Sequence, residues 1–352
     1  MSIAVPTQAP GIFGLKSRFA LCFAPASALV YPFVLKVFNA SVTALPQAGG
    51  AVAASAALSL ALAFALPAAI LAAAIRYAEI EAPTVAQLRA RRVAIFAVAA
   101  PTIFVFIGVL LYMAGDPVPD TWLWVVFWAA LMILLLRADN ASPAVVAAQP
   151  IVPALRVAHG ISALGIVAIF LGFHIVNHAT GVLGPEAHTA FMKAVRHIYR
   201  AAVIQPVLVA LFFFQVGSGL YFAWRYTARP MDRFRAFQIA SGMYLAFYVI
   251  GHMDSVFIFA RTYLGIDTGW GFATGAPTGL VKDPWNIRLV PHYALGVFFV
   301  LAHLAAGVRM ILLSHGARKA IADRLMIGGA VAAALVSAVV ILAMCGMRVT
   351  FA

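Results

Sequence analysis

The residues with the clearest chemical potential are four histidines in the stretch "GFHIVNHATGVLGPEAHTAFMKAVRHIYR", residues 172–200. Imidazole nitrogens bind metals and haem iron, and they exchange protons near neutral pH. His174 and His178 are four residues apart, so in a helix they share one face. The stretch therefore indicates one of two things: a metal or haem site, or a hydrated loop between two apolar helices.

The composition decides what surrounds these histidines. Of the 352 residues, 64% are hydrophobic and only 10% are charged, whereas soluble domains carry about 25% charged residues. Apolar runs of roughly 20 residues, enough to cross a bilayer, recur along the chain. The sequence predicts an integral membrane protein whose main partner is the lipid bilayer. Its net charge of +13 is interpreted as loop charges that orient and anchor the helices, not as a nucleic-acid surface.

Nine apolar segments predict an all-α polytopic membrane protein with about nine transmembrane helices. The first is as long as a full span, so we interpret it as an uncleaved helix and not as a signal peptide. The expected spans are 19–40, 51–75, 93–114, 121–136, 157–178, 201–224, 236–260, 290–313 and 326–347.

The basic residues give an orientation for nine spans. If the loops alternate sides, the side of the N-terminus, which includes Lys16 and Arg18, receives 16 of the 24 Lys and Arg residues, and the other side receives 8. Cytoplasmic loops carry the excess of positive charge. We therefore expect a cytoplasmic N-terminus and an outer C-terminus, in a bacterial inner membrane.

The histidines divide the chain in two. Residues 1–150 contain none, and all nine lie between His159 and His315. The segment 137–156, with three prolines and a turn-rich start, is the natural divider. We expect a four-helix membrane bundle over 1–150 and a five-helix membrane module over 151–352. The N-terminal part shows no identifiable chemistry, but its small residues suit close helix packing.

The C-terminal module contains a weak internal repeat. The expected helices 157–178 and 236–260 each carry a histidine toward the end, and Gln215 in 201–224 aligns with His303 in 290–313. A small pair, a histidine about three turns later, and then H-x-x-x-G-x-R (His303, Gly307, Arg309) resemble the cytochrome b subunit of succinate dehydrogenase and fumarate reductase. The resemblance covers roughly residues 155–350. It implies a four- to five-helix bundle that binds haem b and exchanges electrons with quinone.

Carried over by position, the resemblance implies two ligand pairs. One is His174 or His178 with His252, and the other is Gln215 with His303. An amide is a poor haem ligand, so we expect one haem b, near the outer face, with His174 and His252 as the iron ligands. His174, His178, His252 and His303 are the candidate cofactor-binding residues, and no catalytic residue is identified.

Helix geometry supports the outer pair without the family. His174 lies 18 residues beyond Arg156, and His252 lies 17 beyond Arg235. At 1.5 Å per residue, both are about 26 Å from the cytoplasmic boundary. Because their helices run in the same direction, the two rings could meet at one depth. The long, aromatic and Gly-rich loop 261–292 could cover this face.

Each histidine also has a plainer interpretation. His188 and His197 fit hydrated interfacial positions best, and His178 could share that role. His174 and His252 could simply hydrogen-bond across helices, and His303 could do the same with Gln215. The glycines near them could serve close packing.

Three functions remain open from the sequence. The first is a b-type cytochrome that carries electrons between a quinone and a redox partner protein. The second is a histidine-ligated non-haem metal enzyme, for which the 174/178 spacing fits but further histidine boxes and carboxylates are scarce. The third is a transporter or a structural membrane protein without a cofactor, although we see few buried charges and no clear helix break.

Overall fold

The computed structural model describes residues 17–45, 49–145 and 150–349. These residues form helices joined by loops, and no strand occurs among them beyond one isolated bridge between Thr84 and Pro143. Seven helical segments are long and apolar enough to cross a bilayer: Phe23–Ala44, Gly50–Ala78, Pro153–Leu183, Ile204–Thr227, Arg233–Tyr263, Asn286–Ser314 and Lys319–Met344. The protein is thus an all-α polytopic membrane protein.

The expected span 93–114 is wrong in its start and its shape. The chain forms α4 (Val85–Ala97) and α5 (Ala100–Met113), bent by 63° where they meet. Pro101, in the first turn of α5, has no N–H to continue the α4 hydrogen bonds, and its ring would press on the carbonyl of Ala97. Only α4 and α5 taken together are long and apolar enough to cross a bilayer. Helix α6 (Asp120–Leu136) is apolar but shorter than the seven spans. The number nine therefore stays a prediction.

The bend also corrects the statement that the chain has no clear helix break. Broken helices in transporters present backbone groups to a polar substrate at the midplane. Here the residues at the bend, Val98, Ala99 and Ala100, are apolar and at most 1% exposed. The bend is packed in the core and offers no polar lining.

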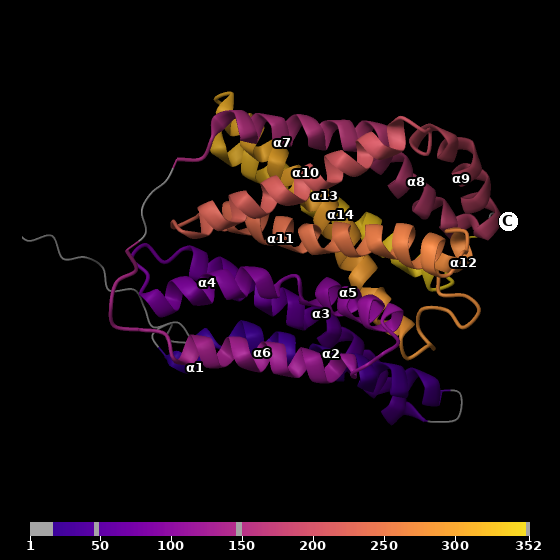
Figure 1. Ribbon diagram of the computed structural model, residues 1–352, viewed down its shortest axis with the longest axis horizontal. Helices are drawn as coiled ribbons and strands as arrows, with labels where there is room; N and C mark the ends of the chain where they lie inside the picture. The colour runs from indigo at the N-terminus through magenta and orange to yellow at the C-terminus, as the bar shows by residue number, and fades with distance from the viewer. Residues whose placement is uncertain (1–16, 46–48, 146–149, 350–352) are drawn as a thin grey trace, which may run out of the picture.

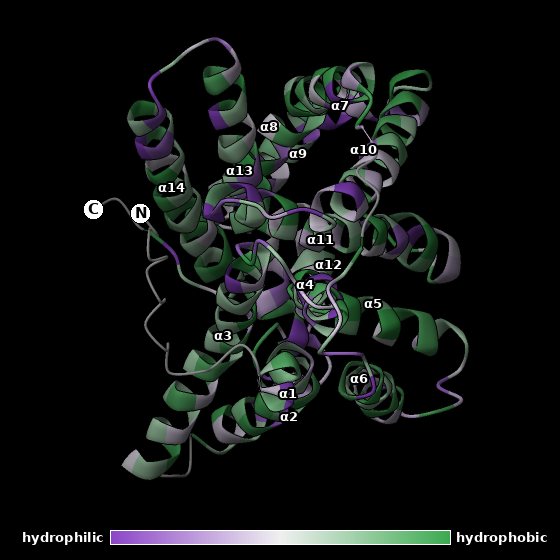
Figure 2. Ribbon diagram, turned by 90° about the vertical axis from the view of Figure 1, so that its left-hand side faces the viewer, coloured by the Kyte–Doolittle hydropathy of each residue, from purple (hydrophilic) through white to green (hydrophobic). Residues whose placement is uncertain are grey.

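The N-terminal helices and the C-terminal helices pack as one body. The first group comprises α1 (Arg18–Leu21), α2 (Phe23–Ala44), α3 (Gly50–Ala78), α4, α5 and α6. In the end-on view, α4 and α5 lie between α1, α2 and α6 on one side and the C-terminal helices on the other (Figure 2). One hydrophobic core runs through both groups. Lys16 and residues 146–149 of the divider 137–156 lie outside the described residues.

A fully buried arginine joins the two groups. The side chain of Arg91 in α4 is fully buried and donates four hydrogen bonds to backbone carbonyls. Two acceptors, Tyr77 O (2.9 Å) and Ile80 O (2.6 Å), lie at the end of α3. The other two, Thr227 O (3.1 Å) and Arg229 O (2.9 Å), lie at the end of α10. Helix C-termini carry unsatisfied carbonyls and partial negative charge, which a guanidinium fork complements.

The C-terminal module is built from long antiparallel helices. Its main helices are α7 (Pro153–Ile166), α8 (Gly172–Thr180), α10 (Ile204–Thr227), α11 (Arg233–Met253), α13 (Leu289–Ser314) and α14 (Lys319–Met344). Along the chain, α7 packs on α10, α10 on α11, α11 on α13 and α13 on α14. We call the end where α7, α11 and α14 begin the basic end. The other end, with α8, α9 (Pro185–Tyr199) and α12 (Trp270–Ala273), is the histidine end, at the right of Figure 1.

The span that carries His159, His174 and His178 is the most weakly packed. Only 6% of the central residues of Pro153–Leu183 are buried, against 22–50% in the other six spans. Helix α7 packs mainly against α10.

Candidate haem site at the histidine end

Two π-helical segments flank the histidines expected to act together. In the span 153–183, the π-helical segment Val167–Leu171 comes just before His174. In the span 233–263, the π-helical segment Asp254–Tyr263 comes just after His252. A π turn adds a residue to the helical turn and so rotates the side chains that follow it. Such segments are rare and concentrate at functional sites.

The structure brings His174 and His252 together from α8 and α11. Their ring centroids are 6.0 Å apart, with the ring planes at 70°. Two imidazoles on opposite sides of one iron, each with a metal–nitrogen bond of about 2 Å, would have centroids about 6.3 Å apart. Any angle between ring planes is compatible with such axial ligation. The spacing of this pair thus fits a haem held between two helices.

Aromatic rings hold both imidazoles in orientation. Phe170, one turn before His174, stacks on that ring at 4.8 Å, and Tyr199 meets Phe170 edge-on at 5.2 Å. Tyr248, one turn before His252, lies parallel to it at 5.7 Å. Residues four apart in a helix naturally stack in this way. The backbone periodicity therefore supplies the packing that fixes each ring.

Further rings continue from the pair toward the surface. His178 lies 4.7 Å from His174, His188 lies 5.3 Å from His178, and Trp270 lies 4.6 Å from His188, centroid to centroid. Trp270 comes from the loop 261–292 and covers this end, as the sequence suggested. It passes so close to Gly181 that any Cβ there would collide with the indole. Glycine at 181 thus lets the indole reach His188.

The interpretation of His188 as a hydrated residue is wrong. Its side chain is 2% exposed, and its Nε2 lies 3.0 Å from Asn177 Nδ2. Burial lowers the pKa of His188 to about 4, because the protein interior disfavours the charged imidazole. The ring is neutral at pH 7. His197, by contrast, is exposed.

A second group of rings adjoins His252 from α13. His292, 3% exposed, lies 4.7 Å from Tyr248, and Tyr293 lies 6.5 Å from His252. The Nδ1 atoms of His178, His188 and His292 are buried without a hydrogen-bond partner among the described residues. The sequence predicted no role for His292. Its burial follows from its position in the first turn of α13, which packs against α11.

The predicted pairing of Gln215 with His303 does not occur in the structure. Gln215 Nε2 instead donates to His159 O (2.7 Å) and Ser162 Oγ (2.6 Å) on α7. His303 Nδ1 lies 3.0 Å from Ser241 Oγ on α11. The alignment of the two residues in the repeat does not make them neighbours, because Gln215 on α10 faces α7.

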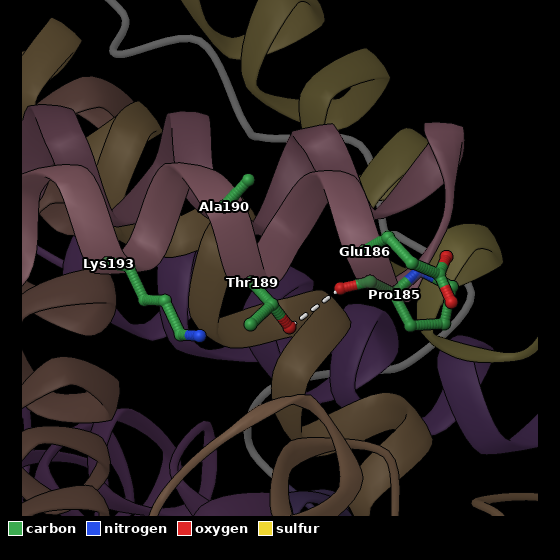
Figure 3. Close-up of a pocket in the computed structure, with 5 residues that line it drawn as sticks. All are labelled: Pro185, Glu186, Thr189, Ala190 and Lys193. Atoms are coloured by element: carbon green, nitrogen blue, oxygen red, sulfur yellow. Dashed lines mark hydrogen bonds between the residues drawn. The ribbon is translucent and has the colours of Figure 1, made fainter.

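One surface pocket lies apart from the histidines. It is a shallow depression on α9, lined by Pro185, Glu186, Thr189, Ala190 and Lys193 (Figure 3). Thr189 Oγ1 donates a hydrogen bond to Pro185 O (2.8 Å), a carbonyl of the first turn of the same helix. His188 and Met192 occupy a different face of the same helix and are buried. The depression is a surface feature and supplies no ligand to the ring cluster.

Among residues 17–45, 49–145 and 150–349, no three or more His, Cys, Asp or Glu side chains are arranged to hold a metal ion. A porphyrin supplies four nitrogen ligands to its iron, so the protein needs to supply only two axial ligands. The pair offers two imidazole rings. No protein-family model, curated protein or solved structure matches this chain.

Proposed function

We propose that this membrane protein is a b-type cytochrome that carries electrons between a quinone and a redox partner protein. A haem b bound between α8 and α11 would be held by His174 and His252. The observation that carries the proposal is the 6.0 Å spacing of these two rings, at equal depth in two spans that are each interrupted by a π-helical segment.

The residues around the pair have separate tasks in this proposal. Haem b, when bound, supplies one-electron redox chemistry. His174 and His252 offer their imidazole nitrogens, and Phe170 and Tyr248 fix the rotation of those rings. Trp270 and the end of α8 shield the pair from water, and the surrounding low dielectric tunes the redox potential.

The partners follow from the position of the site in the membrane. The site lies within the apolar spans, where a quinone diffuses. The basic end carries the clustered arginines 225, 229, 233 and 235. The positive-inside rule assigns that end to the cytoplasm of a bacterial inner membrane, with the N-terminus inside and the C-terminus outside. The histidine end then faces outward, toward a redox partner protein.

An optical spectrum of the purified protein tests the proposal. We expect the absorption of a low-spin b haem, with loss of the haem bound at this site in His252→Ala and His174→Ala. His197→Ala, an exposed histidine at the same end, is the matched control and should keep the wild-type spectrum. His178→Ala decides whether His178 rather than His174 is the ligand.

Two results would favour the other functions. A bound transition metal without haem would favour the non-haem metal enzyme. Neither haem nor metal in protein purified without chelators would favour a transporter or a structural membrane protein.

A further inference from the structure

Basic residues gather at one place on the histidine end, the side that receives fewer of them. They lie in residues 193–200, at the end of α9, and in 261–268, where the π-helical segment ends and the loop to α12 begins. The two segments contain four basic residues against a single carboxylate: Lys193, Arg196, Arg200 and Arg261 against Asp267. They supply 4 of the 8 basic residues assigned to this side. The rule that orients the helices therefore does not explain them.

Two of the arginines bind the same stretch of this loop. Arg196 and Arg200 are four residues apart at the end of α9, so they share one face of the helix. Both Nη atoms of Arg196 donate to the carboxylate of Asp267, and Arg200 Nη2 donates to Thr268 Oγ1 at 3.0 Å. Because Asp267 and Thr268 are consecutive, these bonds bring the two guanidinium groups to adjacent points on the loop.

The third arginine joins them from the end of the π-helical segment. Ile266 N donates to Ala260 O at 2.9 Å. This bond places the residue that precedes Asp267 against the residue that precedes Arg261. Arg261 is therefore next to the part of the loop that the arginines of α9 hold. We call the three side chains the arginine cluster: Arg196, Arg200 and Arg261.

The arginine cluster has hydrogen-bond donors without acceptors. Each guanidinium carries five N–H donors, and the Nε atoms of Arg200 and Arg261 have no hydrogen-bond partner among the described residues. Arg261 lies over the ring of Phe257, with its Cζ 4.7 Å from the ring centroid. Burial lowers the pKa of Arg200, and the charges of Arg261 and Arg196 lower it further. An anion between the guanidinium groups would accept hydrogen bonds from them and offset their mutual repulsion.

The surface beside the arginine cluster is apolar and faces the lipid. Arg200 lies four residues before α10, and Arg261 lies two residues before the end of its span. Both are thus at the level of the headgroups of a bilayer. Val203, Val207 and Ile258, on the adjoining turns, are 74%, 50% and 50% exposed. Acyl chains can pack on these side chains while a phosphate group binds to the arginines.

We propose that the arginine cluster binds the phosphate group of an anionic phospholipid. Guanidinium groups match phosphate oxygens in bidentate pairs and lose less hydration than ammonium groups when they are partly buried. Basic pockets between transmembrane helices bind anionic headgroups in this way. The apolar surface favours a lipid over free inorganic phosphate, which has no chains to bury. This inference is independent of the proposed haem.

Native mass spectrometry of the full chain in a non-ionic detergent tests the site. The probes are phosphatidylglycerol and phosphatidylcholine, whose phosphate is balanced by the choline charge. We expect a single phosphatidylglycerol to bind about tenfold more tightly than phosphatidylcholine, as one charge-assisted hydrogen bond would give. Excess inorganic phosphate should leave it bound. Equal binding of the two lipids, or displacement by inorganic phosphate, would overturn the lipid site.

Substitutions locate the bound lipid. Arg200→Gln and Arg261→Gln each remove hydrogen bonds to a charged group, so each should weaken phosphatidylglycerol binding by about tenfold. The double variant should lose the preference over phosphatidylcholine. Lys282→Gln is the matched control, because it removes one positive charge from an exposed residue at the same end, and it should bind as the wild type does. Wild-type affinity in the double variant would contradict the proposal.

Asp267→Asn gives a gain of binding that misfolding cannot imitate. The carboxylate of Asp267, whose side chain is 68% exposed, competes with the lipid phosphate for Arg196. Its removal should tighten phosphatidylglycerol binding, and gel filtration in detergent checks that every variant is monodisperse. Unchanged or weaker binding by Asp267→Asn would mean that the arginines only hold the loop, and the lipid site would be refuted.

Discussion

Replacement of Arg91 by methionine should destabilise the whole protein, because this side chain closes the ends of two helices from different halves of the chain. Its four hydrogen bonds, between 2.6 and 3.1 Å, all reach backbone carbonyls. Hydrogen bonds that involve a charged group contribute about 1.5–3 kcal/mol each. Four would give a gross value of about 6–12 kcal/mol.

The net loss will be smaller than this sum. Methionine fills much of the same volume, and freed carbonyls at helix ends can bind water that enters from the interface. A buried acceptor left without its donor costs about 1–3 kcal/mol, and since water can reach some of the four carbonyls we expect Arg91→Met to cost about 3–5 kcal/mol in all. For a chain of this size, the midpoint of thermal unfolding in detergent should drop by about 5–10 °C.

The neighbouring Arg89 gives a matched control. It is on the same helix but exposed, so Arg89→Met removes the same charge and should move the midpoint by less than about 1 °C. Arg91→Lys keeps the charge but not the planar fork, and should recover only a small part of the loss. Equal midpoints for Arg91→Met and Arg89→Met would refute the role of Arg91 as a link between the halves.

Two further predictions concern acid stability and topology. The pKa of His188 is about 4 in the folded state, below its value of about 6.5 in the unfolded state. Between these two pH values the unfolded state therefore binds a proton that the folded state does not. The free energy of unfolding should fall by about 3 kcal/mol as the pH drops from 6.5 to 4. Thermal unfolding across this range should show the loss, and His188→Phe should remove most of it; an unchanged pH dependence in the variant would contradict the burial argument. A reporter fused after Ala352 should be active only outside the cytoplasm, and cytoplasmic activity would mean an even number of crossings.

The sequence predicted the class of fold and the level of the outer pair, because both depend on one-dimensional quantities. Apolar length identifies spans, and counting residues from Arg156 and Arg235 places His174 and His252 at one depth. The bend at Pro101 was also readable, since a proline inside an apolar run removes a backbone donor. That signal was missed because the hydropathy continues across it.

The partner of Gln215 could not be predicted in the same way. Whether Gln215 faces His303 or α7 depends on the rotation of α10 about its axis. Side-chain packing sets this rotation, and the hydropathy of the sequence does not reveal it. The burial of His188 was missed because 185–199 was taken for a loop. The spacing of His188 and Met192, four residues apart on one face, was the available signal of an amphipathic helix.

The bonds of Arg91 also place a time constraint on biosynthesis. Its last acceptor, Arg229 O, is 138 residues further along the chain. Since the ribosome adds about 5–20 residues per second, Arg91 leaves it about 7–28 s before that carbonyl exists. During this interval the first helices have inserted, yet the guanidinium can reach only the two carbonyls at the end of α3. The N-terminal half must therefore remain in the membrane as an open assembly until the arrival of α10 closes it.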